Sequence, residues 1–155
     1  MSDQPRPRRT RQIVGWREWV ALPDLGVGRT KAKVDTGAKT SAIHAWDLEI
    51  EEVEGVTVAR FALHPVQRDD TTSIAASATV VGWREVRSSN GETERRPAIV
   101  TPVVLGEDRW DVELTLARRD EMGFRMLLGR SALRRRYLVD PARSYQGGAD
   151  RVPPR

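Results

Sequence analysis

The stretch V-D-T-G-A-K-T-S-A, from Val34 to Ala42, decides the fold of this chain. The residues T-K-A-K-V at 30–34 alternate polar and apolar side chains, which is typical of a half-buried β-strand. The strand pattern ends at Asp35, and a hydroxyl residue, a glycine and an alanine follow it. Because such a tripeptide also forms ordinary Asx turns, Asp35 is either a turn residue or one half of a catalytic pair.

The rest of the chain predicts an all-β protein. Further strands are expected at residues 13–23, 48–53, 56–63, 78–86, 95–105, 109–116, 124–128 and 137–139. Asn90-Gly91 readily takes the positive φ angles that tight hairpin turns need. Pro97 and Pro102 favour edge or irregular positions in their strand. Many short strands with regular turn signals and little helix indicate a barrel or a sandwich.

Length and composition indicate a single folded domain. The chain has 155 residues, of which 39% are hydrophobic, and this fits one domain with its own core. It contains no cysteine, which excludes disulfides and thiolate metal sites. We expect a disordered basic tail at 1–12, one folded domain at 13–146 and a second tail at 147–155.

Charge and hydropathy limit the classes of partner that the chain is expected to have. The net charge of +4 fits acidic partners, and the arginines before residue 12 are expected to form a solvated tail rather than a nucleic-acid site. No apolar run approaches the ~20 residues of a membrane span. The sequence therefore predicts a soluble, cytoplasmic protein with no membrane partner, and nucleic-acid binding through the arginine tail is kept as a weaker alternative.

Two other kinds of chemistry find little support. G-V-G-R-T-K at 26–31 lacks the spacing of a phosphate-binding loop, so it predicts a hairpin turn. His44 and His64 are the only histidines, and a catalytic zinc ion needs three protein ligands. We expect no metal and no other cofactor, and a zinc peptidase that uses His44, His64 and a carboxylate is kept as an alternative.

Longer motifs carry a family resemblance. K-V-D-T-G-A-K-T-S-A-I-H at 33–44 and M-L-L-G-R-S-A-L at 126–133 resemble the paired segments of retropepsin-type aspartic peptidases. The resemblance is closer to a bacterial and archaeal branch often labelled ATP-dependent zinc protease. It also rests on the motifs at 13–23, 86–97 and 137–145. It implies a retropepsin-like closed barrel, the acid-protease fold, with one short helix after Leu-Leu-Gly.

The resemblance implies an aspartic endopeptidase. Such an enzyme uses two carboxylates that share one proton, because like charges ~3 Å apart cannot both ionise. This chain carries one Asp-Thr-Gly, and the similar residues 70–72 lack the glycine. The second carboxylate would therefore be Asp35 of the partner subunit in a homodimer.

The resemblance also implies roles for the neighbouring residues. Catalysis is assigned to Asp35, Thr36 and Gly37, with Thr36 holding the backbone of the partner's loop and Gly37 allowing the two loops to approach. A flap hairpin is expected at 86–96. The expected substrate-binding residues are Ala38, Lys39, Ser89, Asn90, Gly91 and Arg130.

The resemblance bears on the substrate as well. The family is associated with an ATP-grasp ligase that adds glutamates to the C-terminus of a ribosomal protein. A cleft lined by Lys and Arg side chains would suit such an acidic, glutamate-rich tail. A non-catalytic peptide-binding or regulatory module of the same fold is the second alternative.

Overall fold

The chain folds into strands with very little helix. The computed structural model describes residues 11–66, 71–87, 91–118, 123–147 and 151–152. The strands are β1 Arg11–Val14, β2 Arg17–Leu22, β3 Val27–Asp35, β4 Ser41–His44, β5 Trp46–Val53, β6 Val56–Leu63, β7 Ile74–Thr79, β8 Gly82–Arg87, β9 Thr93–Leu105, β10 Asp108–Ala117, β11 Met126–Gly129, β12 Tyr137–Val139 and β13 Arg151–Val152. The helical pieces are the 3-10 turn η1, Pro23–Leu25, and the helix α1, Arg130–Leu133. In the part of the chain that the structure describes, no helix is long and apolar enough to cross a membrane.

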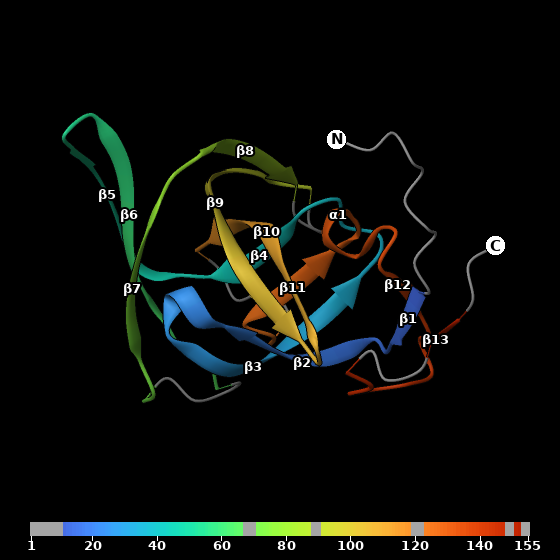
Figure 1. The fold of residues 1–155 in the computed structure, drawn as a ribbon. Coiled ribbons are helices and arrows are strands. Elements are labelled where there is room, and N and C mark those ends of the chain that lie inside the picture. Colours follow the sequence, from blue (N-terminus) through green and yellow to red (C-terminus); the bar gives the residue numbers. More distant parts are fainter. Residues whose placement is uncertain (1–10, 67–70, 88–90, 119–122, 148–150, 153–155) are drawn as a thin grey trace, which may run out of the picture.

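A seven-stranded sheet in the order β10-β4-β11-β3-β2-β9-β8 forms the body of the molecule. An additional pairing of β10 with β9 closes this sheet into a ring, from which β8 extends (Figure 1). The ring encloses fully buried apolar side chains, among them Leu22, Ile99, Leu114, Leu116 and Leu128. The all-β fold with one short helix directly after the Leu-Leu-Gly segment is thus confirmed.

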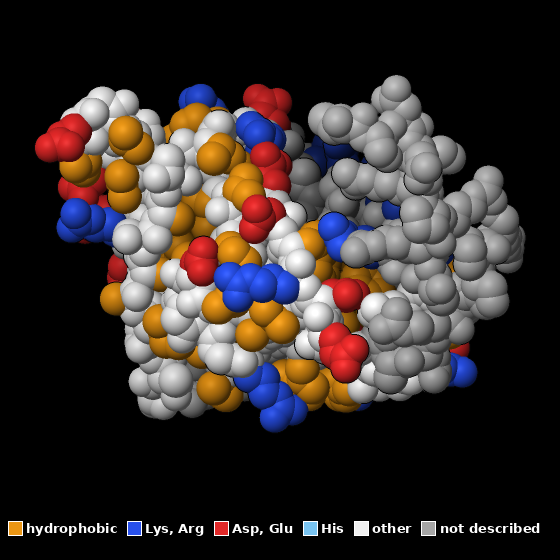
Figure 2. Space-filling model, in the orientation of Figure 1, with side chains coloured by type: hydrophobic (Ala, Val, Ile, Leu, Met, Phe, Trp, Pro, Cys, Tyr) orange, Lys and Arg blue, Asp and Glu red, His pale blue; other side chains and the backbone are white. Residues whose placement is uncertain are grey.

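A second sheet, β5-β6-β7, stands beside the ring. Its β5–β6 hairpin projects away from the body, at the left of Figure 1. Glu54 and Gly55 have φ angles of 50° and 81° at the tip, which is the left-handed pair that a tight hairpin turn requires. Hydrophobic and charged side chains alternate on the exposed surface of this hairpin (Figure 2), where Ile50, Val53 and Val56 are exposed.

The two ends of the described chain meet in a third sheet. β1 pairs in parallel with β12 and antiparallel with β13. β1 thus includes Arg11 and Gln12 from the expected N-terminal tail, and β13 lies within the expected C-terminal tail. Residues 1–10, 148–150 and 153–155 of those tails lie outside the described residues.

Two predicted strands are each divided in the structure. The segment 13–23 gives β1 and β2, and the chain bends between them at Gly15 and Trp16. The backbone of Arg143 packs there, because a Cβ on Gly15 would lie 2.1 Å from the Arg143 carbonyl oxygen, and the Trp16 N–H donates to that oxygen at 2.9 Å. The segment 78–86 divides in the same way into β7 and β8.

Strand β9 accommodates two prolines by changing its neighbours along its length. Residues 93–98 pair with β8, and residues 98–105 pair with β10. At Pro97 the paired neighbour is β8, and at Pro102 it is β10. Each proline therefore has one side of its strand without a ladder partner, as its missing N–H demands.

Tyr137 joins the terminal sheet to the body. Its hydroxyl donates a hydrogen bond of 2.8 Å to Asp108 Oδ2, and its ring lies 5.6 Å from that of Trp110. Burial, followed by the hydrogen bond to Asp108 and the charge of that carboxylate, raises the pKa of Tyr137 far above its ordinary value. The phenol therefore stays protonated in the folded chain.

We expect Tyr137→Phe to lower the free energy of unfolding by about 1–2 kcal/mol at neutral pH, because it removes a hydrogen bond to a charged acceptor. Above about pH 10 an unfolded tyrosine releases its proton while folded Tyr137 keeps it, so this part of the wild-type stability is lost as the pH rises. The free energy of unfolding of the variant should therefore fall less than that of the wild type above about pH 10. Urea unfolding of both proteins at neutral and alkaline pH measures the difference, and equally steep declines would contradict it.

Candidate active site

Asp35 is the last residue of β3 and lies half-buried at the edge of the ring. Its Oδ1 accepts hydrogen bonds from the backbone N–H groups of Gly37, at 3.0 Å, and Ala38, at 3.2 Å. Among the described residues, no basic side chain forms an ion pair with this carboxylate. The loop thus presents a single carboxylate near the surface, oriented by its own backbone.

The Leu-Leu-Gly strand lies directly beside this loop. β11 runs between β3 and β4, parallel to the first and antiparallel to the second. Gly129 is the register partner of Asp35, and Leu128 is the partner of Val34. The chain therefore leaves β3, turns through Asp-Thr-Gly and returns as β4, with the companion segment inserted between the two strands.

Helix α1 satisfies the carbonyl groups of the loop. The backbone N–H of Arg130 donates to Ala38 O at 2.8 Å, and that of Ser131 donates to Lys39 O at 3.1 Å. The guanidinium of Arg130 donates to Gly37 O at 3.2 Å. Arg130, which was predicted to bind substrate, holds the loop in this structure, and a contact with substrate stays a prediction.

Gly129 lies where the two segments approach most closely. Its N–H donates to Ser41 Oγ at 3.0 Å. A Cβ at this position would lie 2.5 Å from Thr40 O and 2.8 Å from Ala38 O, both of them backbone atoms of the loop. Only glycine fits here without moving the loop.

We therefore expect Gly129→Ala to lower the free energy of unfolding by about 2–3 kcal/mol and to displace the Asp35 loop, because the backbone has to give way. Gly28→Ala is the matched control, since a Cβ at that exposed position of β3 meets nothing within 4 Å. The control should change stability by less than about 0.5 kcal/mol. Equal losses in urea unfolding of the two variants would show that the close approach is unimportant.

The predicted flap is present as a hairpin. β8 and β9 pair antiparallel from Gly82 opposite Ala98 to Arg87 opposite Thr93. The hairpin expected at 86–96 is therefore confirmed and extends further toward the body. Of its predicted tip, Gly91 is exposed with a φ angle of 86°, whereas Ser89 and Asn90 lie outside the described residues. A role as a substrate flap stays a prediction.

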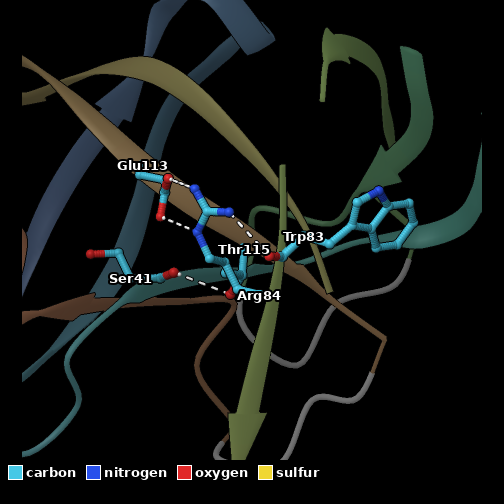
Figure 3. Close-up of polar contacts among 5 residues, drawn as sticks. All are labelled: Ser41, Trp83, Arg84, Glu113 and Thr115. Carbon is cyan, nitrogen blue, oxygen red and sulfur yellow. Dashed lines mark hydrogen bonds and ion pairs between the residues drawn. The ribbon is translucent and has the colours of Figure 1, made fainter. Parts of the chain in front are cut away.

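An ion pair anchors the base of this hairpin to β10 (Figure 3). Arg84 donates from Nη2 and Nε to the carboxylate of Glu113, at 2.6 and 3.2 Å, and from Nη1 to Trp83 O, at 3.1 Å. Two residues further along β10, Thr115 Oγ1 donates to Ser41 O of the neighbouring strand β4 at 3.3 Å. The base is thus fixed to β10, which pairs with β4, the strand that follows the Asp35 loop.

A cavity of about 560 Å³ lies between the Asp35 loop, the hairpin base, β10 and α1. Lys39 and Thr40 line it from the loop, Arg84 from β8, Asp111 from β10 and Arg136 from the turn after α1. Its volume suits side chains of a bound peptide. Of these residues the sequence singled out Lys39. Alternation along β10 places Asp111 on the outer face, but no local pattern shows which elements meet there.

The two histidines lie elsewhere, around Trp46. His44 stacks on the Trp46 ring at 3.7 Å and 10°, and the His64 ring lies 4.1 Å from the same ring. The guanidinium of the buried residue Arg125 lies 4.8 Å from the centre of that ring. No group of three or more His, Asp or Glu side chains able to hold a metal ion occurs among the described residues. The donor set there does not fit the zinc alternative.

A strand that ends in Asp-Thr-Gly, a Leu-Leu-Gly strand inserted beside it and a hairpin near the loop define a retropepsin-type fold. This chain belongs to the RimB-like family, described as retropepsin-like aspartic endopeptidase RimB, and the family's sequence model matches residues 13–148.

Similar proteins include much longer chains. A probable alpha-L-glutamate ligase of Shewanella pealeana is 47% identical over 133 residues, which are 86% of this chain and 29% of that protein. A probable alpha-L-glutamate ligase of Desulfotalea psychrophila is 43% identical over 132 residues, 85% of this chain and 28% of that protein. This chain thus spans less than a third of these curated relatives.

A solved structure has the same fold. It is the protein Lpg0085 of Legionella pneumophila, of unknown function, which is 27% identical to this chain. The two superpose with a TM-score of 0.72 over 88% of this chain and 98% of the other. Almost the whole of that protein therefore corresponds to the ring and its adjoining sheets.

Proposed function

We propose that this chain is an aspartic endopeptidase whose active site is completed by a second copy of the chain. One observation carries the proposal: Asp35 stands at the edge of the ring with Oδ1 bound to the Gly37 and Ala38 N–H groups. A two-fold axis beside this loop would bring two identical carboxylates together. Family membership supports the same chemistry.

The paired carboxylates would act as base and acid in turn. Two carboxyl groups in contact hold one proton between them, because both cannot ionise at that distance. The ionised Asp35 takes a proton from a water molecule, which attacks the peptide carbonyl carbon. The protonated Asp35 of the partner subunit donates a hydrogen bond to the carbonyl oxygen, and a proton then passes to the leaving amine. The two pKa values belong to the pair rather than to either subunit.

The proposed substrate is an acidic, glutamate-rich peptide tail. The relatives that contain a region like this chain carry the name of a glutamate ligase. Two activities joined in one chain commonly meet the same substrate, and a peptidase would shorten what such a ligase extends. The positive net charge of the chain and the Lys39 side chain at the cavity suit an anionic tail.

Incubating the full chain with a protein that ends in a run of glutamates, followed by intact-mass measurement, tests this function. We expect products shortened within the acidic tail, and none with Asp35→Asn. The same substrate with glutamines in place of the glutamates should be cleaved more slowly. Binding of the acidic tail without any cleavage across a wide pH range would leave the non-catalytic binding module as the function of this fold.

A further inference from the structure

Strand β3 carries a row of basic side chains that leads to Asp35. Arg29, Lys31 and Lys33 are exposed or half-buried and alternate with the buried residues Thr30, Ala32 and Val34. Because successive residues of a strand point to opposite faces, this row shares the outer face of β3 with Asp35. At ~3.3 Å per residue, Lys33 lies about 7 Å and Arg29 about 20 Å from Asp35 along the strand.

The neighbouring strands add to this surface. Arg17 of β2 is the register partner of Lys33, and Trp19 is the partner of Lys31. The ring of Trp19 lies 3.6 Å from the Arg29 guanidinium carbon and 5.3 Å from Lys31 Nζ. Stacking on an aromatic ring holds a cation in place without neutralising its charge. We call the four cations Arg17, Arg29, Lys31 and Lys33 the basic row.

The basic row has no acidic partner among the described residues. Arg17 donates from Nε to Ser144 Oγ at 3.2 Å, and its guanidinium lies 4.6 Å from the Trp16 ring and 4.9 Å from the Tyr145 ring. Its direct neighbour across the two strands is Lys33, and like charges in such opposed positions destabilise a sheet. An anion bound between them removes that repulsion.

Two other cations near the loop are engaged by the protein itself. The Arg130 guanidinium donates to Gly37 O, and Arg84 is paired with Glu113. Lys33 differs from both, because it contacts no carboxylate in the described chain. It differs from the exposed Lys39 of the loop, because it lies on the same strand face as Asp35, two residues before it.

We infer that Lys33, with Arg17 opposite it, is a specificity-determining residue that binds an acidic side chain of the peptide next to the cleaved bond. Lys31 and Arg29 extend this contact to acidic residues further along the peptide. The inference rests on the proposed function for the nature of the ligand. It assigns recognition to a strand face that lies before Asp35 in the chain, whereas the predicted substrate-binding residues all follow it.

Binding of fluorescein-labelled peptides to the Asp35→Asn chain tests the inference without cleavage. One peptide carries a run of glutamates, and the other carries glutamines at the same positions. Lys33→Met keeps much of the side-chain volume and removes the charge, so we expect about tenfold weaker binding of the glutamate peptide. Lys31→Met should weaken it a few-fold, because this charge lies further from the cleaved bond. Neither variant should alter binding of the glutamine peptide.

Arg109→Met is the matched control. Arg109 is an exposed cation on β10, and its ion pair with Asp24 is long, at 3.9 Å. Its loss removes one positive charge that is not part of the basic row, and should change binding less than twofold at physiological salt. Equal effects of Lys33→Met and Arg109→Met would overturn the inference, as would an equal loss of binding for both peptides.

The same variants separate this inference from the proposed function. A chain that binds the glutamate peptide through Lys33 but never cleaves it supports the inference and refutes the peptidase. A chain that cleaves acidic tails equally well with Lys33 and with Met at that position supports the peptidase and refutes the inference.

Discussion

Replacing Asp35 by Asn is expected to reduce cleavage of an acidic tail by about 10⁴-fold or more. In a homodimer the change removes both the base that activates water and the acid that polarises the carbonyl, and general acid–base groups contribute about 10²–10⁴-fold each. Asn keeps the shape of the side chain and its oxygen can still accept from the Gly37 and Ala38 N–H groups. The fold should therefore remain intact.

The matched control for this experiment is Asp47→Asn. Asp47 is exposed on the projecting hairpin and has a φ angle of 53°, a conformation that Asn tolerates well. Its variant should cleave like the wild type, and thermal unfolding should show that both variants are folded. Substantial cleavage by folded Asp35→Asn would exclude this carboxylate as a catalytic group.

Replacing Glu18 by Ala is expected to cause the largest loss of stability, about 3–5 kcal/mol. Glu18 is fully buried, and its carboxylate accepts from the backbone N–H groups of Gly15 at 2.7 Å, Gln146 at 2.9 Å and Gly147 at 2.7 Å. Each lost bond leaves a donor without its charged acceptor, and such unpaired groups cost about 1–3 kcal/mol each. The effects overlap, so the sum is smaller than three full penalties.

Urea unfolding of Glu18→Ala, Glu18→Gln and Glu107→Ala measures this effect. Glutamine can keep part of the hydrogen bonding, so Glu18→Gln should lose less stability than Glu18→Ala and more than Glu107→Ala. Glu107 is exposed in the turn before β10, and its replacement should cost less than about 0.5 kcal/mol. A Glu18→Ala variant within 1 kcal/mol of the wild type would show that the carboxylate does not hold the C-terminal segment.

The alternation of β2 places Glu18 at a position where an apolar residue is expected. In β2 the inward positions are Glu18, Val20 and Leu22, so a charged residue stands on the core face. A buried carboxylate requires hydrogen-bond donors. Its donors at Gln146 and Gly147 come from the other end of the chain, however, and no local pattern indicates which segment supplies them.

The local elements of the site could be predicted, and their arrangement could be predicted in part. The alternation before Asp35 and the tight turn at Asn90-Gly91 follow from periodicity and turn residues, and the resemblance implied the flap hairpin at 86–96 and the short helix after Gly129. The resemblance paired the Asp-Thr-Gly and Leu-Leu-Gly segments, but the placement of β11 between β3 and β4 appears only in the structure, because pairing between distant segments leaves no trace in local pattern. The Arg84–Glu113 anchor and the cavity beside Lys39 depend on three elements meeting in space, so they appear only in the structure.

The basic row could be predicted from the sequence in part. The alternation at 30–34 predicts a strand, and the same alternation places Lys33 on the face of Asp35. The identity of its neighbour across the sheet, Arg17, depends on the β2–β3 register, which shifts between Val20 and Leu22. A bulge of this kind changes the pairing by one residue, and the sequence does not specify where it falls.

The central claim is that the active site needs one Asp35 from each of two subunits. Mixing wild-type chain with Asp35→Asn chain at constant total concentration, with time for subunit exchange, tests it most directly. If active molecules are dimers of two wild-type chains, an equal mixture should retain about a quarter of the cleavage rate. A mixture that retains about half, in proportion to the wild-type chain present, would contradict the claim, because each chain would then be acting alone.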